Sequence, residues 1–189
     1  VLEILHVGRI TEIKNIVTLI ETAKILKETW NKKFHITLLG STTTKEDNEY
    51  LKKIKYMISK YALNDTVIFG GSVSNSDIMR YYNKSDITVN MTPTGGVDKV
   101  VLESMASGVP VLSSNEAFKA YFDKYSSALI FKERDQVDLA QKIKHLFEDV
   151  DMKEISEFLV KKAKEKGKTK KSDKEIIDKS ISLRTFISL

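Results

Sequence analysis

Two basic residues stand in the loop that follows the first apolar segment of the chain. Residues 2–7 are mostly apolar, the segment ends at Gly8, and Arg9 and Lys14 follow before a helical pattern begins near Asn15. Arginine offers a planar fork to phosphate oxygens, lysine offers a point charge, and a helix start adds unpaired N–H groups and a favourable dipole. The arrangement predicts a cradle for an anion. The alternative is a pair of ordinary surface charges, since charged side chains are mostly exposed.

A glycine pair marks the second candidate site. Gly95 and Gly96 precede a predicted helix over 98–107, and paired glycines let backbone N–H groups approach a ligand. Glu103 stands on this helix among apolar residues, where a carboxylate is costly unless something hydrogen-bonds it. The two vicinal hydroxyls of a ribose would satisfy it, and a solvent-facing or capping role is the alternative. Asp98 either contacts a ligand or caps its own helix.

These two loops match neither of the common glycine-rich phosphate motifs. The sequence contains no G-x-G-x-x-G and no G-x-x-x-x-G-K-[ST]. The dinucleotide fingerprint and the P-loop are therefore excluded, and another kind of anion site is expected.

The elements that must position these residues alternate between strands and helices. Apolar runs predict six strands, over residues 2–7, 34–39, 66–69, 86–91, 110–112 and 128–131. Helical spacing predicts helices over 16–30, 45–61, 77–82, 98–107, 116–121 and 135–147, with Asn15 and Ser74 as caps. The alternation predicts an α/β fold: a doubly wound, Rossmann-like, parallel six-stranded sheet with helices on both faces. Ligands of such folds bind beyond the carboxyl ends of the strands.

Composition limits the classes of protein to consider. The chain has 189 residues, 41% of them hydrophobic, which is enough for a sizeable core. It has no cysteine and three scattered histidines, so neither a disulfide nor a protein-built metal site is expected. No apolar stretch reaches about 18 residues and no secretory signal is visible, so we expect a cytoplasmic protein. Because the first residue is Val, directly before a core strand, we expect a piece of a longer protein.

The net charge of +5 is concentrated in one lysine-rich segment, residues 161–174. This segment carries eight lysines against Glu165 and Asp173, a net charge of +6, which leaves about −1 for the remainder. A solvated helix face, a peripheral contact with an anionic membrane and a linker are the alternatives. Nucleic-acid binding is not expected, because the segment lacks interleaved aromatic residues and any recognition motif.

Four motifs together resemble the donor-binding half of retaining glycosyltransferases of the GT-B fold, family 4 (group 1). They cover about residues 1–150 and are Gly8-Arg9 with Lys14-Asn15, the loop 69–73, Tyr82 with 85–87, and 101–111. Each is weak alone, but the order and the spacing of all four agree with the family.

The resemblance implies a binding site for a nucleoside diphosphate sugar. Arg9 and Lys14 match the basic pair that clamps the diphosphate and stabilises the leaving group, Glu103 matches the carboxylate that holds the ribose, and the backbone of Val73 matches a contact to the base. The backbone N–H groups near Lys99 and Val100 match those that meet the phosphates. The other residues expected to bind the donor nucleotide are Gly8, Gly95, Gly96, Val97 and Asp98. The resemblance implies no metal and no further cofactor.

One position departs from the family pattern. Many members carry a second glutamate, eight residues before the ribose carboxylate, that touches the donor sugar, and this position is Gly95 here. Backbone, Asp98 or another domain must then supply the sugar contact. A non-catalytic scaffold or regulatory domain of the same fold is the alternative function that this departure favours.

The resemblance also implies two parts. Residues 1–150 form the donor-nucleotide-binding domain, and residues 151–189 form C-terminal helices over 152–166 and 174–189. The second helix carries Ile177, Ile181 and Phe186 with no obvious partner in the sheet, so we expect it to pack against an absent amino-terminal acceptor domain. The chain alone is then expected to bind the donor without transferring sugar.

Overall fold

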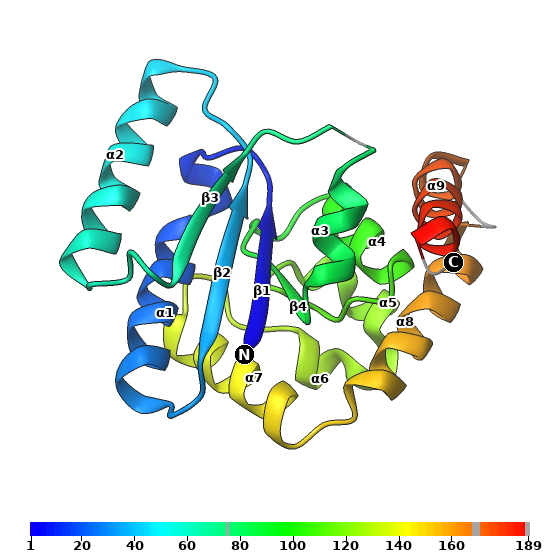
Figure 1. The fold of residues 1–189 in the computed structure, drawn as a ribbon. Helices are drawn as coiled ribbons and strands as arrows, with labels where there is room; N and C mark the ends of the chain where they lie inside the picture. Colours follow the sequence, from blue (N-terminus) through cyan, green and yellow to red (C-terminus); the bar gives the residue numbers. More distant parts are fainter. Residues whose placement is uncertain (75, 168–170, 188–189) are drawn as a thin grey trace.

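The computed structural model describes the backbone of residues 1–74, 76–167 and 171–187, and the side chains of these except 167, 171–173 and 183–187. The described residues form one parallel sheet with strand order β3-β2-β1-β4-β5 and helices on both faces (Figure 1). The strands are β1 (Leu2–Val7), β2 (Phe34–Leu39), β3 (Val67–Gly71), β4 (Ile87–Asn90) and β5 (Val111–Ser113). The doubly wound architecture is therefore confirmed.

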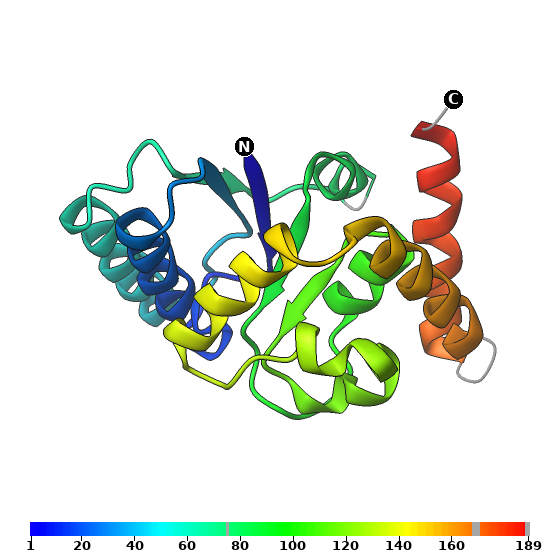
Figure 2. The ribbon, with the colours of Figure 1, turned by 90° about the horizontal axis from the view of Figure 1, so that it is seen from below.

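Helices follow every strand of this sheet. The α-helices are α1 (Ile16–Thr29), α2 (Lys45–Lys60), α3 (Ile78–Lys84), α4 (Lys99–Ala106), α5 (Lys119–Phe122), α6 (Ser126–Leu129), α7 (Gln136–Glu148), α8 (Met152–Gly167) and α9 (Lys171–Ile187). Short 3-10 helices cover η1 (Glu12–Lys14), η2 (Glu116–Phe118) and η3 (Asp123–Tyr125). Figure 2 shows α3 on one side of the sheet and α1 with α7 on the other.

The predicted sixth strand, residues 128–131, is wrong. Its first residues lie in the short helix α6, and only Ile130 bridges to Ser113 of β5. The N–H of Ile130 donates to Ser126 O at 2.9 Å, which closes the helical turn, and the N–H of Phe131 reaches Ser113 O at 3.1 Å. Four consecutive apolar residues bury equally well as a strand or as a helical turn, so the pattern does not distinguish the two.

The two predicted caps behave differently. The side-chain oxygen of Ser74 accepts from the N–H of Asp77 at 3.2 Å, at the start of α3. Asn15 precedes α1 as predicted, but its backbone is left-handed, with a φ of 48°, and its side chain caps no backbone group. Its amide donates to the hydroxyl of Thr18 at 2.8 Å instead. Asparagine tolerates this conformation, so Asn15 turns the chain into α1.

Alternate residues of the strands point into two apolar clusters. Ile4 and Ile36 face the larger cluster, which includes residues from α1, α2 and α7. Leu5 and Leu39 face the smaller one, with Tyr82 of α3. Burial on both faces explains why the strands read as continuous apolar runs. Burial of both faces thus stabilises the sheet, and the loops at the carboxyl ends of its strands start from a rigid base.

A close approach of two loops shapes that edge. Gly40, directly after β2, has a φ of +143°, and a Cβ built on it would lie 1.8 Å from the carbonyl oxygen of Gly8. The N–H of Gly8 donates to Leu39 O at 2.9 Å, and the N–H of Ile10 donates to Ser41 O at 3.0 Å. Only glycine allows the two loops to meet so closely.

The last two helices pack onto the body of the protein. Helix α9 contacts α4 and α8, and Ile177 is 1% exposed within the larger apolar cluster, against which Ile181 also packs. Ile177 and Ile181 were expected to have no obvious partner in the sheet, and helices α4 and α8 supply the contact instead. Packing of α9 against an amino-terminal domain stays a prediction. The side chain of Phe186 lies outside the described residues.

The lysine-rich segment is only partly described, since residues 168–170 lie outside. Within α8, Lys162 pairs with Asp123 at 2.8 Å, and the ammonium of Lys166 lies 5.1 Å from the ring centre of Tyr121. Lys161 and Lys164 are exposed. Two lysines of the segment therefore hold α8 against α5 and η3. Over the described residues, no helix is both long and apolar enough to cross a membrane.

Candidate functional site

Three loops at the carboxyl edge of the sheet enclose a cavity of about 190 Å³. Gly8 and Arg9 after β1, Ser41 after β2, and Val73 after β3 line it, and Ile78 of α3 closes one side. Arg9 is exposed and has no ion-pair partner among the described residues. The structure thus brings three of the predicted site residues, Gly8, Arg9 and Val73, around one space.

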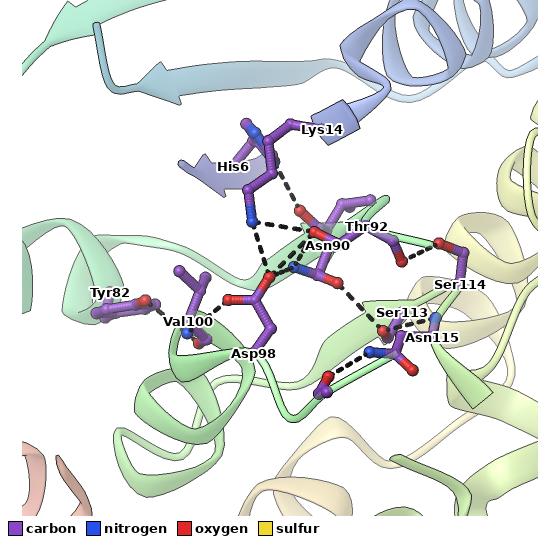
Figure 3. A network of polar contacts seen from close by, with 12 residues as sticks. His6, Lys14, Tyr82, Asn90, Thr92, Asp98, Val100, Ser113, Ser114 and Asn115 are labelled. Carbon is purple, nitrogen blue, oxygen red and sulfur yellow. Dashed lines mark hydrogen bonds and ion pairs between the residues drawn. The ribbon is translucent and has the colours of Figure 1, made fainter. Parts of the chain in front are cut away.

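Lys14 reaches from η1 across to the loop between β4 and α4 (Figure 3). Its ammonium donates to Asp98 Oδ2 at 2.9 Å and to the hydroxyl of Thr92 at 3.1 Å. The side chains of Lys14 and Asp98 are only 18% and 14% exposed. A buried lysine needs such partners, because removing its charge from water is costly. Lys14 is therefore held in a fixed place beside the start of α4.

Asp98 is the centre of a polar network built on β4. Its Oδ2 also accepts from the Asn90 amide and from the Thr92 hydroxyl, each at 3.0 Å. Its Oδ1 accepts from the N–H of Val100 at 3.4 Å, which caps α4. Burial by itself raises the pKa of Asp98, but the hydrogen bonds and charge of these partners, Lys14 first, bring it below the ordinary value. Asp98 is therefore a carboxylate at neutral pH.

Asp98 was expected either to contact a ligand or to cap its own helix. The capping role is confirmed by the hydrogen bond from Val100. Both carboxylate oxygens already have partners inside the protein, which leaves a contact with a donor sugar as the weaker of the two roles.

His6 lies buried on β1 next to this network. Its Nδ1 is 3.0 Å from the carbonyl oxygen of Val89. A carbonyl only accepts, so the proton lies on Nδ1 and Nε2 is an acceptor. Burial lowers the pKa of His6 to about 4, against that hydrogen bond and with the help of the Lys14 charge. Nε2 is the only buried side-chain nitrogen or oxygen without a partner in the described part of the chain.

Glu103 points into the protein. It is 8% exposed, so the solvent-facing alternative is wrong. The phenol of Tyr82 donates to Glu103 Oε2 at 3.3 Å, and the ammonium of Lys99 lies 3.1 Å from Oε1. Burial, followed by the charge of Glu103, raises the pKa of Tyr82 well above its ordinary value, so the phenol keeps its proton. Tyr82 compensates the burial of Glu103 with a hydrogen bond, and the sequence pattern on α4 could not predict this partner.

A second cavity, of about 170 Å³, opens beside Glu103. Glu103 and Lys99 of α4, Ile78 of α3, and Glu175 and Lys179 of α9 line it. Ile78 lines both cavities, whereas Glu103 does not line the cavity of Gly8, Arg9 and Val73. That the two cavities belong to one binding site stays a prediction.

The loop that carries the glycine pair is held by Asn115. The side-chain oxygen of Asn115 accepts from Gly95 N at 3.4 Å, and its amide donates to Gly96 O at 2.9 Å. A Cβ at Gly96 would meet nothing within 4 Å. Both glycines are exposed, and Val97 packs against the larger apolar cluster. The glycines therefore leave open space beside a backbone that Asn115 fixes.

Four polar residues of the site were not singled out from the sequence: His6, Asn90, Thr92 and Asn115. Their signal was available, because polar residues at the end of a buried strand point to the edge where ligands bind. His6 stands second from the end of β1, and Asn90 is the last residue of β4. Among the described residues, no group of three or more His, Cys, Asp or Glu is arranged to hold a metal ion.

Sequence comparison assigns the family. The profile of the family described as "Glycosyl transferases group 1" matches residues 2–166, so the chain belongs to that family. The chain is 30% identical over 135 residues to the alpha-monoglucosyldiacylglycerol synthase of Streptococcus pneumoniae. The match covers 70% of this chain and 29% of that protein, so the chain spans less than a third of this relative.

Structural comparison assigns the fold. The C-terminal domain of LpcC, a glycosyl transferase group 1 family protein of Francisella tularensis, has a TM-score of 0.75 at 20% identity, over 87% of this chain and 85% of that one. HepE of Anabaena, in complex with UDP, has a TM-score of 0.72 at 17% identity, over 98% of this chain and 47% of that one. The chain has the fold of a GT-B glycosyltransferase domain, with five strands in its described sheet where the sequence predicted six.

Proposed function

We propose that this chain is the donor-nucleotide-binding part of a retaining glycosyltransferase that moves a sugar from a nucleoside diphosphate to an acceptor hydroxyl. One observation carries the proposal: the loops after β1 and β3 line a common open cavity, and Arg9 in that lining has no ion-pair partner among the described residues. The solved structure of HepE with UDP shows that a protein of this fold binds such a nucleotide.

Each predicted residue has a role in this proposal. Arg9 and Lys14 hold the diphosphate and stabilise the charge that develops on the leaving group, as fixed cations do in many transfer reactions. Glu103 accepts hydrogen bonds from the ribose hydroxyls, and the backbone at Val73 contacts the base. The loop from Gly95 to Val100 borders the phosphates. No metal or other cofactor takes part.

Calorimetric titration with UDP, GDP and ADP tests the proposal. We expect one nucleotide to bind, and the double variant Arg9→Ala, Lys14→Ala to lose that binding. The control is Lys32→Ala, Lys33→Ala, which removes the same charge from exposed residues directly before β2, at the opposite edge of the sheet. Equal affinities of the two double variants would overturn the proposal.

The reaction also needs an acceptor-binding half, which we place in an amino-terminal domain outside this chain. The chain spans 29% of the synthase and 47% of HepE, which supports a larger whole protein. We therefore expect this chain to transfer no sugar in a product assay. Formation of product by the chain alone would contradict this division of labour.

We further propose that the protein is cytoplasmic and contacts a membrane peripherally. The exposed Lys161 and Lys164, within a segment of net charge +6, support a contact with an anionic lipid surface. Each basic residue near such a surface contributes about 1 kcal/mol.

A further inference from the structure

The carboxylate of Asp98 collects donors of several kinds. They are the ammonium of Lys14, the amide of Asn90, the hydroxyl of Thr92 and the backbone N–H of Val100. A cation, an amide, a hydroxyl and an N–H at a helix start are together the partners that proteins offer to a phosphate. The position beside Lys14 is thus an anion position that a residue of the protein itself fills.

The low exposure of the Lys14–Asp98 ion pair strengthens the electrostatic effect of this carboxylate on an approaching anion. With side chains 14% and 18% exposed, Asp98 and Lys14 are screened far less than a surface ion pair. A phosphate that approaches Lys14 meets the negative charge of Asp98 at nearly the same distance. Repulsion between the two anions is therefore large unless one of them leaves.

We propose that Asp98 holds, in the unliganded protein, the place of one donor phosphate, and that binding exchanges the Lys14–Asp98 ion pair for a Lys14–phosphate pair. The inference rests on the proposed function, because it takes the diphosphate as the incoming anion. It makes Asp98 the residue that sets donor affinity: the carboxylate keeps Lys14 in place and weakens binding at the same time.

The opposite role for Asp98 would be to position Lys14 for a phosphate that both residues then share. Two observations favour exchange. Oδ1 accepts a hydrogen bond from the N–H of Val100, a donor that the phosphates need. Oδ2 accepts hydrogen bonds from the hydroxyl of Thr92 and the amide of Asn90 as well as from Lys14. Positioning a lysine requires only one of these contacts.

The test compares Asp98→Asn and Asp98→Ser with the unaltered chain, in calorimetric titrations with UDP and with inorganic pyrophosphate. Asparagine and serine both cap helices well, so α4 keeps its cap while the charge is removed. Hydrogen bonds to charged groups contribute about 1.5–3 kcal/mol, so we expect affinity for both ligands to rise about tenfold or more. Uridine, which has no phosphate, should bind all three proteins equally.

The control is Asp135→Asn, since Asp135 caps α7 through the N–H groups of Val137 and Asp138 but is paired with no lysine among the described residues. It should leave affinity unchanged. Equal or weaker binding of UDP by both Asp98 variants would overturn the exchange while leaving the proposed function intact. Absence of binding in the unaltered chain and in both variants would overturn both. Binding in the variants alone would support the exchange.

Discussion

Lys14 shows how a residue in a loop can be fixed as firmly as one in the core. Its ammonium has Asp98 and Thr92 as partners, and its chain lies against the turn at Gly8, where a built Cβ would be 3.5 Å from Lys14 Cε. Arg9, five residues earlier, is exposed and has no ion pair among the described residues. The two cations therefore differ: Lys14 is held in place before any ligand binds, whereas under the proposed function Arg9 would be ordered by the ligand.

Glu103 should distinguish a nucleotide from its phosphates alone. We predict that Glu103→Gln weakens UDP binding about tenfold, because a hydrogen bond to a charged group is replaced by a neutral one, and leaves pyrophosphate binding unchanged. Titration calorimetry with both ligands measures this. The exposed Glu28→Gln is the control and should change neither affinity. A parallel loss of both ligands in Glu103→Gln would mean that Glu103 shapes the loop and does not hold the ribose.

His6 should make the protein sensitive to mild acid. Its pKa is about 4 in the folded protein and about 6.5 when unfolded, so between these values only the unfolded chain binds the proton. Stability attributable to His6 is therefore complete above pH 6.5 and falls, by up to about 3 kcal/mol, as the pH drops toward 4. His6→Gln keeps a donor for Val89 O and should lose this pH dependence.

Urea unfolding of both proteins at several pH values measures the effect. The control His145→Gln changes an exposed histidine on α7 and should keep the slope of the unaltered protein. If the difference in unfolding free energy between the unaltered chain and His6→Gln stays constant from pH 7 to pH 4, the buried neutral form of His6 is not what limits stability.

At the scale of elements, the carboxyl ends of β1 and β2 determine the shape of the cradle. We predict that Gly40→Ala costs about 3 kcal/mol, because its Cβ would collide with Gly8 O and its backbone would be strained. Nucleotide affinity should fall too, since the turn that carries Arg9 must shift. Gly96→Ala is the matched control: its Cβ meets nothing, and its stability should change by less than about 0.5 kcal/mol. Equal unfolding midpoints would contradict the close approach.

How much of this could be predicted from sequence depends on how local the cause is. Strands β1 to β5 follow from apolar runs, and α4 follows from Asp98 and Gly108 at its ends, because those signals lie within each segment. The partners of Lys14 and Glu103 lie 84 and 21 residues away, and no pattern within a segment brings them together. The run at 128–131 failed because its position at the sheet edge, not its composition, decides between strand and helix.

On the scale of the whole molecule, α9 lines the second cavity, and both C-terminal helices pack onto the body of the chain. Helix α9 contributes Glu175 and Lys179 to the cavity beside Glu103, while α8 packs between α9 and α5. Ser156 of α8 donates to Gly108 O at the end of α4. Helix α9, which was expected to pack against an absent amino-terminal domain, thus also borders the cavity beside Glu103, and its contact with such a domain stays a prediction.

At the same scale, the proposed membrane contact can be tested on the surface lysines. We predict that the chain sediments with vesicles of phosphatidylcholine and 30% phosphatidylglycerol, about tenfold more than with phosphatidylcholine alone. Changing Lys161, Lys164, Lys168, Lys170 and Lys171 to Gln should abolish the preference while sparing Lys162 and Lys166, which hold α8. The control changes five exposed lysines of α2 to Gln: Lys45, Lys52, Lys53, Lys55 and Lys60. If both variants sediment equally, the lysine-rich segment is an ordinary solvated helix face and the membrane contact is wrong.

A crystal structure of the chain with the nucleotide that binds best in the calorimetric titration tests the proposed donor site. We predict the base beside Val73, the ribose hydroxyls within hydrogen-bond distance of Glu103, and the diphosphate between Arg9 and Lys14, with Lys14 no longer paired to Asp98. A nucleotide bound away from the carboxyl edge of the sheet, with Arg9 and Glu103 untouched, would contradict it.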